Sequence, residues 1–298
     1  MKEIAFGVLL LAHGGSPSWN KDAAKIMREA ENELAMPVEL ALGMADTKAT
    51  QVAVDQLKKR GADKIVAVPL FVNSRSEVMD QTRFILGLSD KPSAILRDAL
   101  AGAAKKHAHH AAKGGGHHHH SFSEKPIVNE LPLVITPALD DHPLVAQVLL
   151  ERALRLSKDA KKEVLLVVGH GPNDEQANDA WLRTMRALAA RARKEGGFAA
   201  GAAFTIRDDA PEPVRQAAIE KLRERVAKET REGRRAVVVP LLLARGGIES
   251  HIVDALVGLS YAWEGQTLAP HPNLARWVAA SARAGAGRKD MRMMKEKL

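Results

Sequence analysis

Three segments of this chain occur twice and in the same order, which indicates an internal duplication. The apolar run GVLLLAHGG, with His13 near its end, matches the run EVLLVVGHG, with His170 near its end. The other two matched pairs are residues 62–80 with 234–254, and residues 134–148 with 266–278. Each half therefore delivers a histidine from a short, β-rich run, and the chain should fold into two similar domains with a shared active cleft between them.

Apolar strand patterns alternate with amphipathic helix patterns in both halves. The first half is expected to contain strands at 4–12, 38–44, 64–71 and 131–136, and helices at 20–35, 48–62, 77–87 and 143–157. The second half is expected to contain strands at 163–169, 200–206, 235–243 and 266–269, and helices at 175–195, 211–232, 249–259 and from 272. This alternation predicts an α/β fold with two doubly wound parallel sheets. Functional groups should gather at the carboxyl ends of the strands.

The repeat sets the expected domain boundaries. The first domain covers 1–157, the second covers 158–285, and a basic tail follows at 286–298. A low-complexity insertion at about 101–125 interrupts the first domain and holds seven of the twelve histidines. Because clustered imidazoles bind nickel, cobalt, zinc and copper, we expect the insertion to gather metal ions.

Composition excludes several classes of protein. The chain has no cysteine, so disulfides, iron–sulfur clusters and thiolate zinc sites are ruled out. A net charge of +8 favours an acidic partner. Nucleic acid is a poor candidate, because the basic residues are spread over helices and aromatic residues make up only 4% of the chain. No apolar run reaches the roughly 20 residues of a membrane span, so we expect a cytoplasmic protein, as a monomer or weak dimer.

The candidate chemistry lies at equivalent positions of the two halves. His251 and Glu77 each follow a serine and each precede an aspartate three residues later, beyond a Val-Pro-Leu strand. The first half thus offers His13 with Glu77, and the second offers His170 with His251. A single histidine at a strand end is often only a structural residue, but two equivalent pairs favour function. An imidazole pair can bind a divalent metal and accept protons near pH 7.

The ordered set of His-Gly after a strand, Val-Pro-Leu leading to SHIVD, and the PHP and DHP segments resembles the class II tetrapyrrole chelatases. The resemblance is greatest to sirohydrochlorin cobalto- and ferrochelatases in their long, two-domain form. It implies insertion of a divalent metal into a sirohydrochlorin-type ring without ATP or an organic cofactor, with cobalt first and iron or nickel as alternatives. The family's two metal-binding, proton-accepting histidines match His170 and His251, whereas Glu77 departs from the pattern.

A sirohydrochlorin substrate carries eight carboxylates, so basic residues near strand ends are candidates for binding it. Arg75, Arg245 and Arg207 are the expected partners, although each could equally be a solvated surface residue. Asp208 is also expected to contribute to substrate binding. Asp208, Asp209 and Asp46 fall where the family often has a carboxylate lining the cleft. All three could instead be helix N-caps ahead of the helices at 48–62 and 211–232.

Two other classes of function are compatible with parts of the sequence. The first is a non-catalytic protein that binds or delivers nickel or cobalt, and it stays open at this point. The second is a different enzyme, since HGG at 13–15 also occurs in oxyanion loops of α/β-hydrolases. That reading requires a G-x-S-x-G motif, which the chain lacks. A histidine phosphatase would have arginine before His-Gly, where this chain has Ala12 and Gly169.

Overall fold

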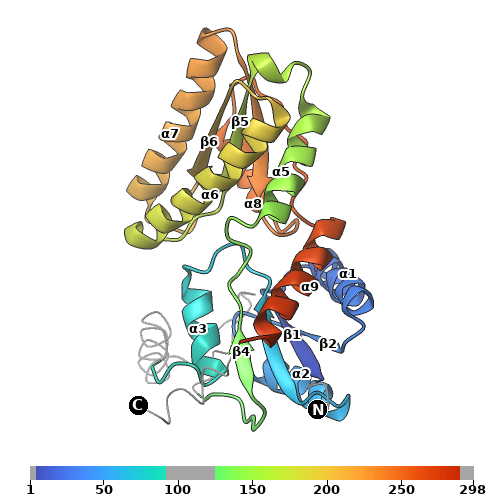
Figure 1. Cartoon of the computed structure of the whole chain (residues 1–298). Helices are drawn as coiled ribbons and strands as arrows, with labels where there is room; N and C mark the ends of the chain where they lie inside the picture. Colours follow the sequence, from blue (N-terminus) through green and yellow to red (C-terminus); the bar gives the residue numbers. More distant parts are fainter. Residues whose placement is uncertain (1–4, 92–124, 289–298) are drawn as a thin grey trace, which may run out of the picture.

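The computed structural model describes residues 5–91 and 125–288, which form two α/β lobes (Figure 1). Apart from Lys125, the histidine-rich insertion expected at 101–125 lies outside the described residues, as does most of the tail expected at 286–298. In the described part of the chain, no helix is both long enough and apolar enough to cross a bilayer.

The first lobe is built on a four-stranded parallel sheet. Its strands are β1 (Phe6–Ala12), β2 (Val38–Leu42), β3 (Lys64–Pro69) and β4 (Leu133–Ile135), in the spatial order β2-β1-β3-β4. Its helices are α1 (Pro17–Leu34), α2 (Thr47–Lys59) and α3 (Glu77–Ile85). Alternate residues of β1 point to opposite faces, so Val8 and Leu10 join one hydrophobic cluster and Leu9 and Leu11 join another. Helices cover both faces, as the sequence predicts.

The second lobe repeats this plan with three parallel strands. Its strands are β5 (Glu163–Gly169), β6 (Ala200–Thr205) and β7 (Arg235–Leu241), in the order β6-β5-β7. The helical elements of this part of the chain are α5 (Pro143–Leu156), the short 3-10 helix η1 (Ala160–Lys162), α6 (Glu175–Gly196), α7 (Glu212–Arg231), α8 (Ile248–Ala255) and α9 (Pro272–Ala286). The predicted doubly wound, duplicated α/β fold is confirmed.

The strand expected at 266–269 is wrong. Leu268 and Ala269 donate backbone hydrogen bonds to the carbonyls of Leu242 and Leu243, at 2.9 and 2.7 Å. Both acceptors lie beyond the end of β7 at Leu241, so there is no strand ladder for this segment to extend. An isolated bridge between Val237 and Ala262 takes the place of the expected pairing.

The last helix of each half packs on the opposite lobe. The sequence boundary at 157 assigns the helix at 143–157 to the first half, but α5 packs against α6 and β7. In turn, α9 packs against α1 and β3, and Figure 1 shows it in the first lobe. The buried Nζ of Lys64, at the start of β3, donates to the carbonyl of Ala286 at the end of α9, at 2.7 Å. Each lobe is therefore completed by a helix from the other half.

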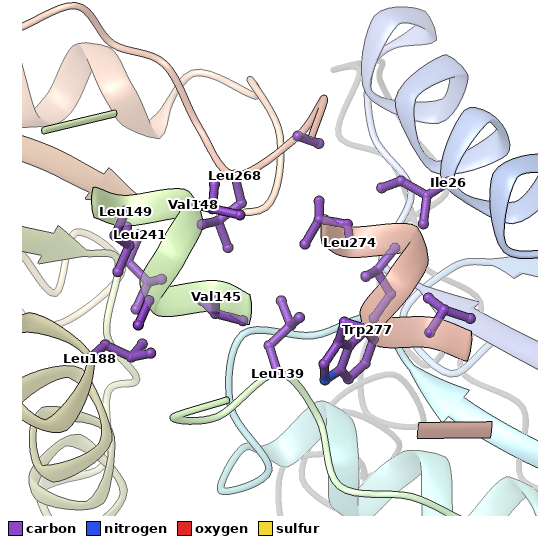
Figure 2. Packing of buried hydrophobic residues seen from close by; sticks show 14 of the residues in the cluster. Ile26, Leu139, Val145, Val148, Leu149, Leu188, Leu241, Leu268, Leu274 and Trp277 are labelled. Atoms are coloured by element: carbon purple, nitrogen blue, oxygen red, sulfur yellow. The ribbon is translucent and has the colours of Figure 1, made fainter. Parts of the chain in front are cut away.

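One hydrophobic cluster runs through both lobes because of this exchange. Figure 2 shows Leu149 of α5 near Leu188 of α6, while Leu274 and Trp277 of α9 lie on the side of Ile26 in α1. Buried Arg152 of α5 strengthens the crossing: its guanidinium donates to the carbonyls of Thr267 and Pro270 at 3.2 and 2.9 Å, just before α9 begins. The exchange fixes the two sheets relative to one another.

Trp277→Ala is expected to destabilise the first lobe, although Trp277 lies near the C-terminal end of the chain. Its side chain is only 1% exposed, and truncation of a buried tryptophan costs about 3–5 kcal/mol. Urea denaturation should show this loss, and amide exchange should show β3 losing protection. Trp263→Ala, at a partly buried position of the second lobe, is the control. Unchanged protection of β3 in Trp277→Ala would contradict the packing of α9 on that sheet.

Candidate functional site

Three side chains meet where the strands of the second sheet end. His170 follows β5, the central strand, while Asp208 lies in the loop after β6 and His251 lies in α8, after β7. Because β6 and β7 flank β5, parallel topology brings their following segments to either side of His170. The sequence-predicted residues His170, His251 and Asp208 are therefore brought together.

One carboxylate links the two imidazoles. Asp208 Oδ1 is hydrogen-bonded to Nδ1 of His170, and Asp208 Oδ2 lies 2.8 Å from Nδ1 of His251. The Asp208 side chain is 10% exposed, against 27% for His170 and 55% for His251. Asp208 thus holds both rings through their Nδ1 atoms and leaves their Nε2 atoms uncontacted by its own carboxylate, although Nε2 of His170 lies 3.2 Å from Oδ2 of Asp209. We call His170, Asp208 and His251 the His–Asp–His cluster.

The cluster is strongly coupled electrostatically. Burial by itself would lower the pKa of His170, but the hydrogen bond and charge of Asp208, assisted by Asp209, outweigh it and raise that pKa. Burial likewise opposes ionisation of Asp208, yet its bonds to His170 and His251 hold its pKa below the ordinary value. The cluster therefore has a carboxylate that stays ionised and an imidazole with increased proton affinity.

The structure distinguishes helix N-caps from other roles for Asp46, Asp208 and Asp209. Helix α7 has Pro211 at its N-cap and no side-chain cap, so the N-cap interpretation is wrong for Asp208 and Asp209. Asp209 is instead exposed, with Oδ2 3.2 Å from Nε2 of His170. The N-cap interpretation is confirmed for Asp46, which accepts a hydrogen bond from Ala49 N at 2.8 Å.

Arg207 does not stand open to a substrate. Its side chain is buried, is paired with Glu175, and donates to the carbonyls of Pro172 and Asn173 at 3.2 and 2.5 Å. Its backbone N–H donates to the carbonyl of His170 at 2.7 Å. All these contacts lie within the loops that carry the cluster. Arg207 therefore holds the His170 and Asp208 loops together, and the expected binding of substrate carboxylates is not supported at this residue.

The loops of the first lobe carry the remaining predicted residues. His13 is exposed at the end of β1, and its Nδ1 lies 2.7 Å from the Gly14 carbonyl. Glu77 begins α3, and Arg75 is exposed in the loop before it. Glu77 makes no hydrogen bond to either cluster histidine within the described residues. Glu77 is exposed, but partial desolvation first, and then the charges of Asp174 and Asp80, raise its pKa.

Contacts between the lobes also border the site. Asp174, whose charge acts on Glu77, lies in the loop between His170 and α6. Arg245 is exposed in the loop before α8, and a methyl group at the adjacent Gly246 would lie 4.0 Å from Cδ1 of Trp19 in the first lobe. The first-lobe loops thus adjoin the segments that carry the cluster. Sequence patterns missed Asp174, because a helix N-cap gives no sign of the charge facing it.

No three His, Asp or Glu side chains within 5–91 and 125–288 are arranged as a ready metal site. In the cluster, Asp208 contacts Nδ1 of both histidines. Both Nε2 atoms are nitrogens of the type that borderline divalent metals bind.

Asp208→Asn is expected to lower the pKa of His170, because burial remains while the carboxylate charge is lost. In the wild type, the raised pKa keeps His170 protonated to a higher pH than a free imidazole of pKa about 6.5. NMR titration of the His170 ring protons would measure the change. Asp46→Asn, which alters a helix cap in the first lobe, is the control. An unshifted His170 in Asp208→Asn would show that the carboxylate does not govern this imidazole.

The comparisons agree with the resemblance inferred from the motifs. Among solved structures, SirB from Bacillus subtilis with Fe3+ has a TM-score of 0.61 at 12% identity, covering 94% of this chain and 95% of that one. SirB from Bacillus subtilis subspecies spizizenii, in complex with cobalt, has a TM-score of 0.58 at 12% identity, covering 94% of each. DR2241 from Deinococcus radiodurans, a multi-domain protein with structural similarity to chelatases, has a TM-score of 0.54 at 18% identity. The alignment covers 96% of this chain and 56% of DR2241.

These structural likenesses, all at low identity, show a shared fold. No curated protein sequence matches the chain. The family model of CbiX does match it, over residues 7–156, from the first strand to the end of α5. On this match, which spans half of the sequence, the chain belongs to the CbiX family.

Proposed function

We propose that this protein is a metal chelatase that inserts a divalent metal ion into sirohydrochlorin or a closely related tetrapyrrole polycarboxylate. The observation that carries the proposal is the His–Asp–His cluster, in which one carboxylate is hydrogen-bonded to two imidazoles at the carboxyl end of the second sheet. Family membership and the fold shared with the SirB sirohydrochlorin chelatases support it.

The chemistry requires ligands and bases in one place. Insertion replaces two pyrrole N–H protons of the ring with one divalent ion, so the ion must lose water and two protons must be accepted. Imidazole Nε2 of His170 and His251 can bind the ion and exchange for ring nitrogens. Asp208 would stabilise each imidazole as it takes up a proton, as a carboxylate does when it holds the far nitrogen of a catalytic histidine. No organic cofactor is needed for these steps.

Two exposed arginines are suited to hold the carboxylates of the ring. Arg75 follows β3 of the first sheet and Arg245 follows β7 of the second, so one lies in each lobe. Guanidinium groups form bidentate, charge-assisted hydrogen bonds with carboxylates. The pair is proposed to orient the substrate, in place of the buried Arg207.

Cobalt is the first metal to test, and iron and nickel are the alternatives. All three suit imidazole ligands, and the two SirB structures are described with Fe3+ and with cobalt. Comparing kcat/KM for Co²⁺, Fe²⁺ and Ni²⁺ under anaerobic conditions would rank them.

Multiple turnover tests the proposal against simple metal binding or delivery. With metal and sirohydrochlorin in tenfold excess over protein, a chelatase should convert the whole pool faster than the spontaneous reaction does. A binding or delivery protein would leave the rate at its spontaneous value. Such a result would reject the chelatase and favour the alternative of a nickel- or cobalt-binding protein.

Deletion of residues 104–122 is expected to lower the number of nickel or cobalt ions bound per chain, because this segment contains the clustered histidines of the insertion. Turnover at saturating metal should stay near the wild-type value, since the cluster is in the other half of the sequence. Equilibrium dialysis and the insertion assay measure the two effects. Loss of turnover at saturating metal would instead make the insertion part of the active site.

A further inference from the structure

The indole of Trp181 connects the two lobes beside the site. Trp181 lies in α6 of the second lobe and is 9% exposed. Its Nε1 donates a hydrogen bond of 2.7 Å to the backbone carbonyl of Arg75 in the first lobe. Glu77, the first residue of α3, follows two residues later. The bond therefore joins the second lobe to the loop that presents both Arg75 and Glu77.

Within the first lobe, this loop is already well ordered. The carboxylate of Asp140 accepts hydrogen bonds from Ser74 N and Oγ, at 2.7 and 2.6 Å. The buried Asn73 side chain accepts from Arg75 N at 2.8 Å, and Ser76 Oγ caps α3 by accepting from Met79 N. The loop is thus a stiff unit, so a contact at Arg75 will also constrain Glu77.

On the second lobe, the same helix connects the contact to the cluster. Helix α6 begins directly after the loop from His170 to its N-cap, Asp174. Trp181 comes six residues after the first residue of α6, Glu175, a rise of about 9 Å along one rigid helix. Asp174 acts on Glu77 through its charge, and Trp181 holds the Arg75 carbonyl. One helix therefore sets the place of the first-lobe loop relative to His170.

The duplicated helix of the first lobe makes a reciprocal approach. Trp19 lies three residues after Ser16, the N-cap of α1, and Trp181 lies seven residues after Asp174, the N-cap of α6. Positions four apart fall on the same helix face. Trp19 adjoins Gly246 in the loop that leads to His251, just as Trp181 reaches the loop that leads to Glu77. Each helix thus carries a tryptophan that lies next to a loop of the opposite lobe, and each of these loops leads to a candidate site residue.

We propose that Trp181 is a positioning residue that fixes the loop from Arg75 to Glu77 against the second lobe and so sets where Glu77 lies relative to the His–Asp–His cluster. The expected effect on catalysis rests on the proposed function. The restraint that Trp181 places on the loop is independent of that function and can be measured without any substrate.

Amide hydrogen exchange of Trp181→Phe tests the hold directly. Phenylalanine keeps an aromatic ring in the buried position but removes the indole N–H. A net hydrogen-bond contribution corresponds to a factor of roughly two to ten, so amides of 73–77 should exchange faster by about that factor. Protection in β1 and β5 should stay unchanged and so report an intact fold. Trp263→Phe, which removes an indole N–H elsewhere in the second lobe, should leave 73–77 unaffected. Equal exchange in wild type and Trp181→Phe would overturn the proposal.

A double-mutant cycle tests the link to Glu77. Trp181→Phe should lower kcat by roughly two- to tenfold through the displaced Glu77, and KM should rise as well, because Arg75 belongs to the same loop. In the Glu77→Gln background, the same substitution should have almost no further effect on kcat. If the two effects multiply, Trp181 does not act through Glu77 and its positioning role is wrong. If the wild type has no chelatase activity, the proposed function fails, while the exchange experiment still decides whether Trp181 holds the loop.

Discussion

Replacing His170 or His251 with alanine is expected to lower the turnover of metal insertion by about a hundredfold or more, the scale typical of losing a positioned general base. Each change removes an imidazole that is proposed to bind the ion and accept a proton. Both side chains lie beyond the carboxyl ends of the strands, and His251 is 55% exposed, so the fold should persist. Anaerobic insertion of cobalt into sirohydrochlorin, followed by absorbance, measures the loss.

His271→Ala is the matched control for these variants. His271 belongs to the same half, but its Nδ1 accepts from Asn273 N as the N-cap of α9, and its Nε2 lies 2.9 Å from Glu151. Removing this cap should cost about 1 kcal/mol of stability and leave turnover unchanged. If His170→Ala and His251→Ala both fold and turn over like His271→Ala, the cluster is not the active site.

Glu77→Gln is expected to reduce turnover by roughly ten- to a thousandfold, because the change keeps the size of the side chain but removes its basicity. Although Glu77 is exposed, partial desolvation and the charge of Asp174 raise its pKa, which brings the carboxylate closer to the range useful for proton transfer. Protonation at low pH should mimic the substitution, so wild-type activity should fall as pH drops through the Glu77 pKa. The pH profiles of kcat for wild type and variant test this.

Asp80→Asn supplies the control on the same helix. Asp80 is exposed in the first turn of α3 and pairs with Arg83 at 2.8 Å, an exposed ion pair of the kind that contributes little to stability. Because the charge of Asp80 is the last of the three causes that raise the Glu77 pKa, its loss should move the low-pH fall in activity slightly to lower pH. Turnover at neutral pH should stay within about twofold of wild type, the scale of losing an exposed ion pair. If Glu77→Gln has the same turnover and pH profile as wild type, the first lobe provides structure alone and all the chemistry belongs to the second.

The duplicated fold could be predicted because each strand and helix signals its type locally. The run at 163–169 is apolar after Glu163, and β5 has those same bounds, with every residue buried. The exchange of α5 and α9 could not be predicted in this way. Their apolar residues show that each helix has a face to bury, but periodicity does not say which sheet the face will cover. The contacts of Arg152 with residues 266–270 join positions more than 100 residues apart, and no local pattern reports them.

Site residues could be predicted where the repeat aligns them, but the role of a residue could not be predicted where it depends on whether the side chain is buried. Matching the two halves identified His170, His251 and Glu77 as candidate site residues. Asp208 was expected to bind substrate, but its carboxylate contacts both imidazoles and links them. Arg207 was expected beside it in the same role, yet its guanidinium is buried among loop carbonyls. Both side chains are largely buried at this bend, where Arg207 has a φ of 50°, and sequence order alone does not show which groups each one contacts.

The catalytic role of the His–Asp–His cluster in metal insertion can be tested by comparing three insertion rates. The initial rate of cobalt insertion into excess sirohydrochlorin should be measured anaerobically with wild type, with the His170→Ala/His251→Ala double variant and without protein. We expect wild type to exceed the spontaneous rate over many turnovers and the double variant to fall to the spontaneous rate while keeping its fold by circular dichroism. A wild-type rate equal to the spontaneous rate, or a folded double variant as fast as wild type, would contradict this catalytic role.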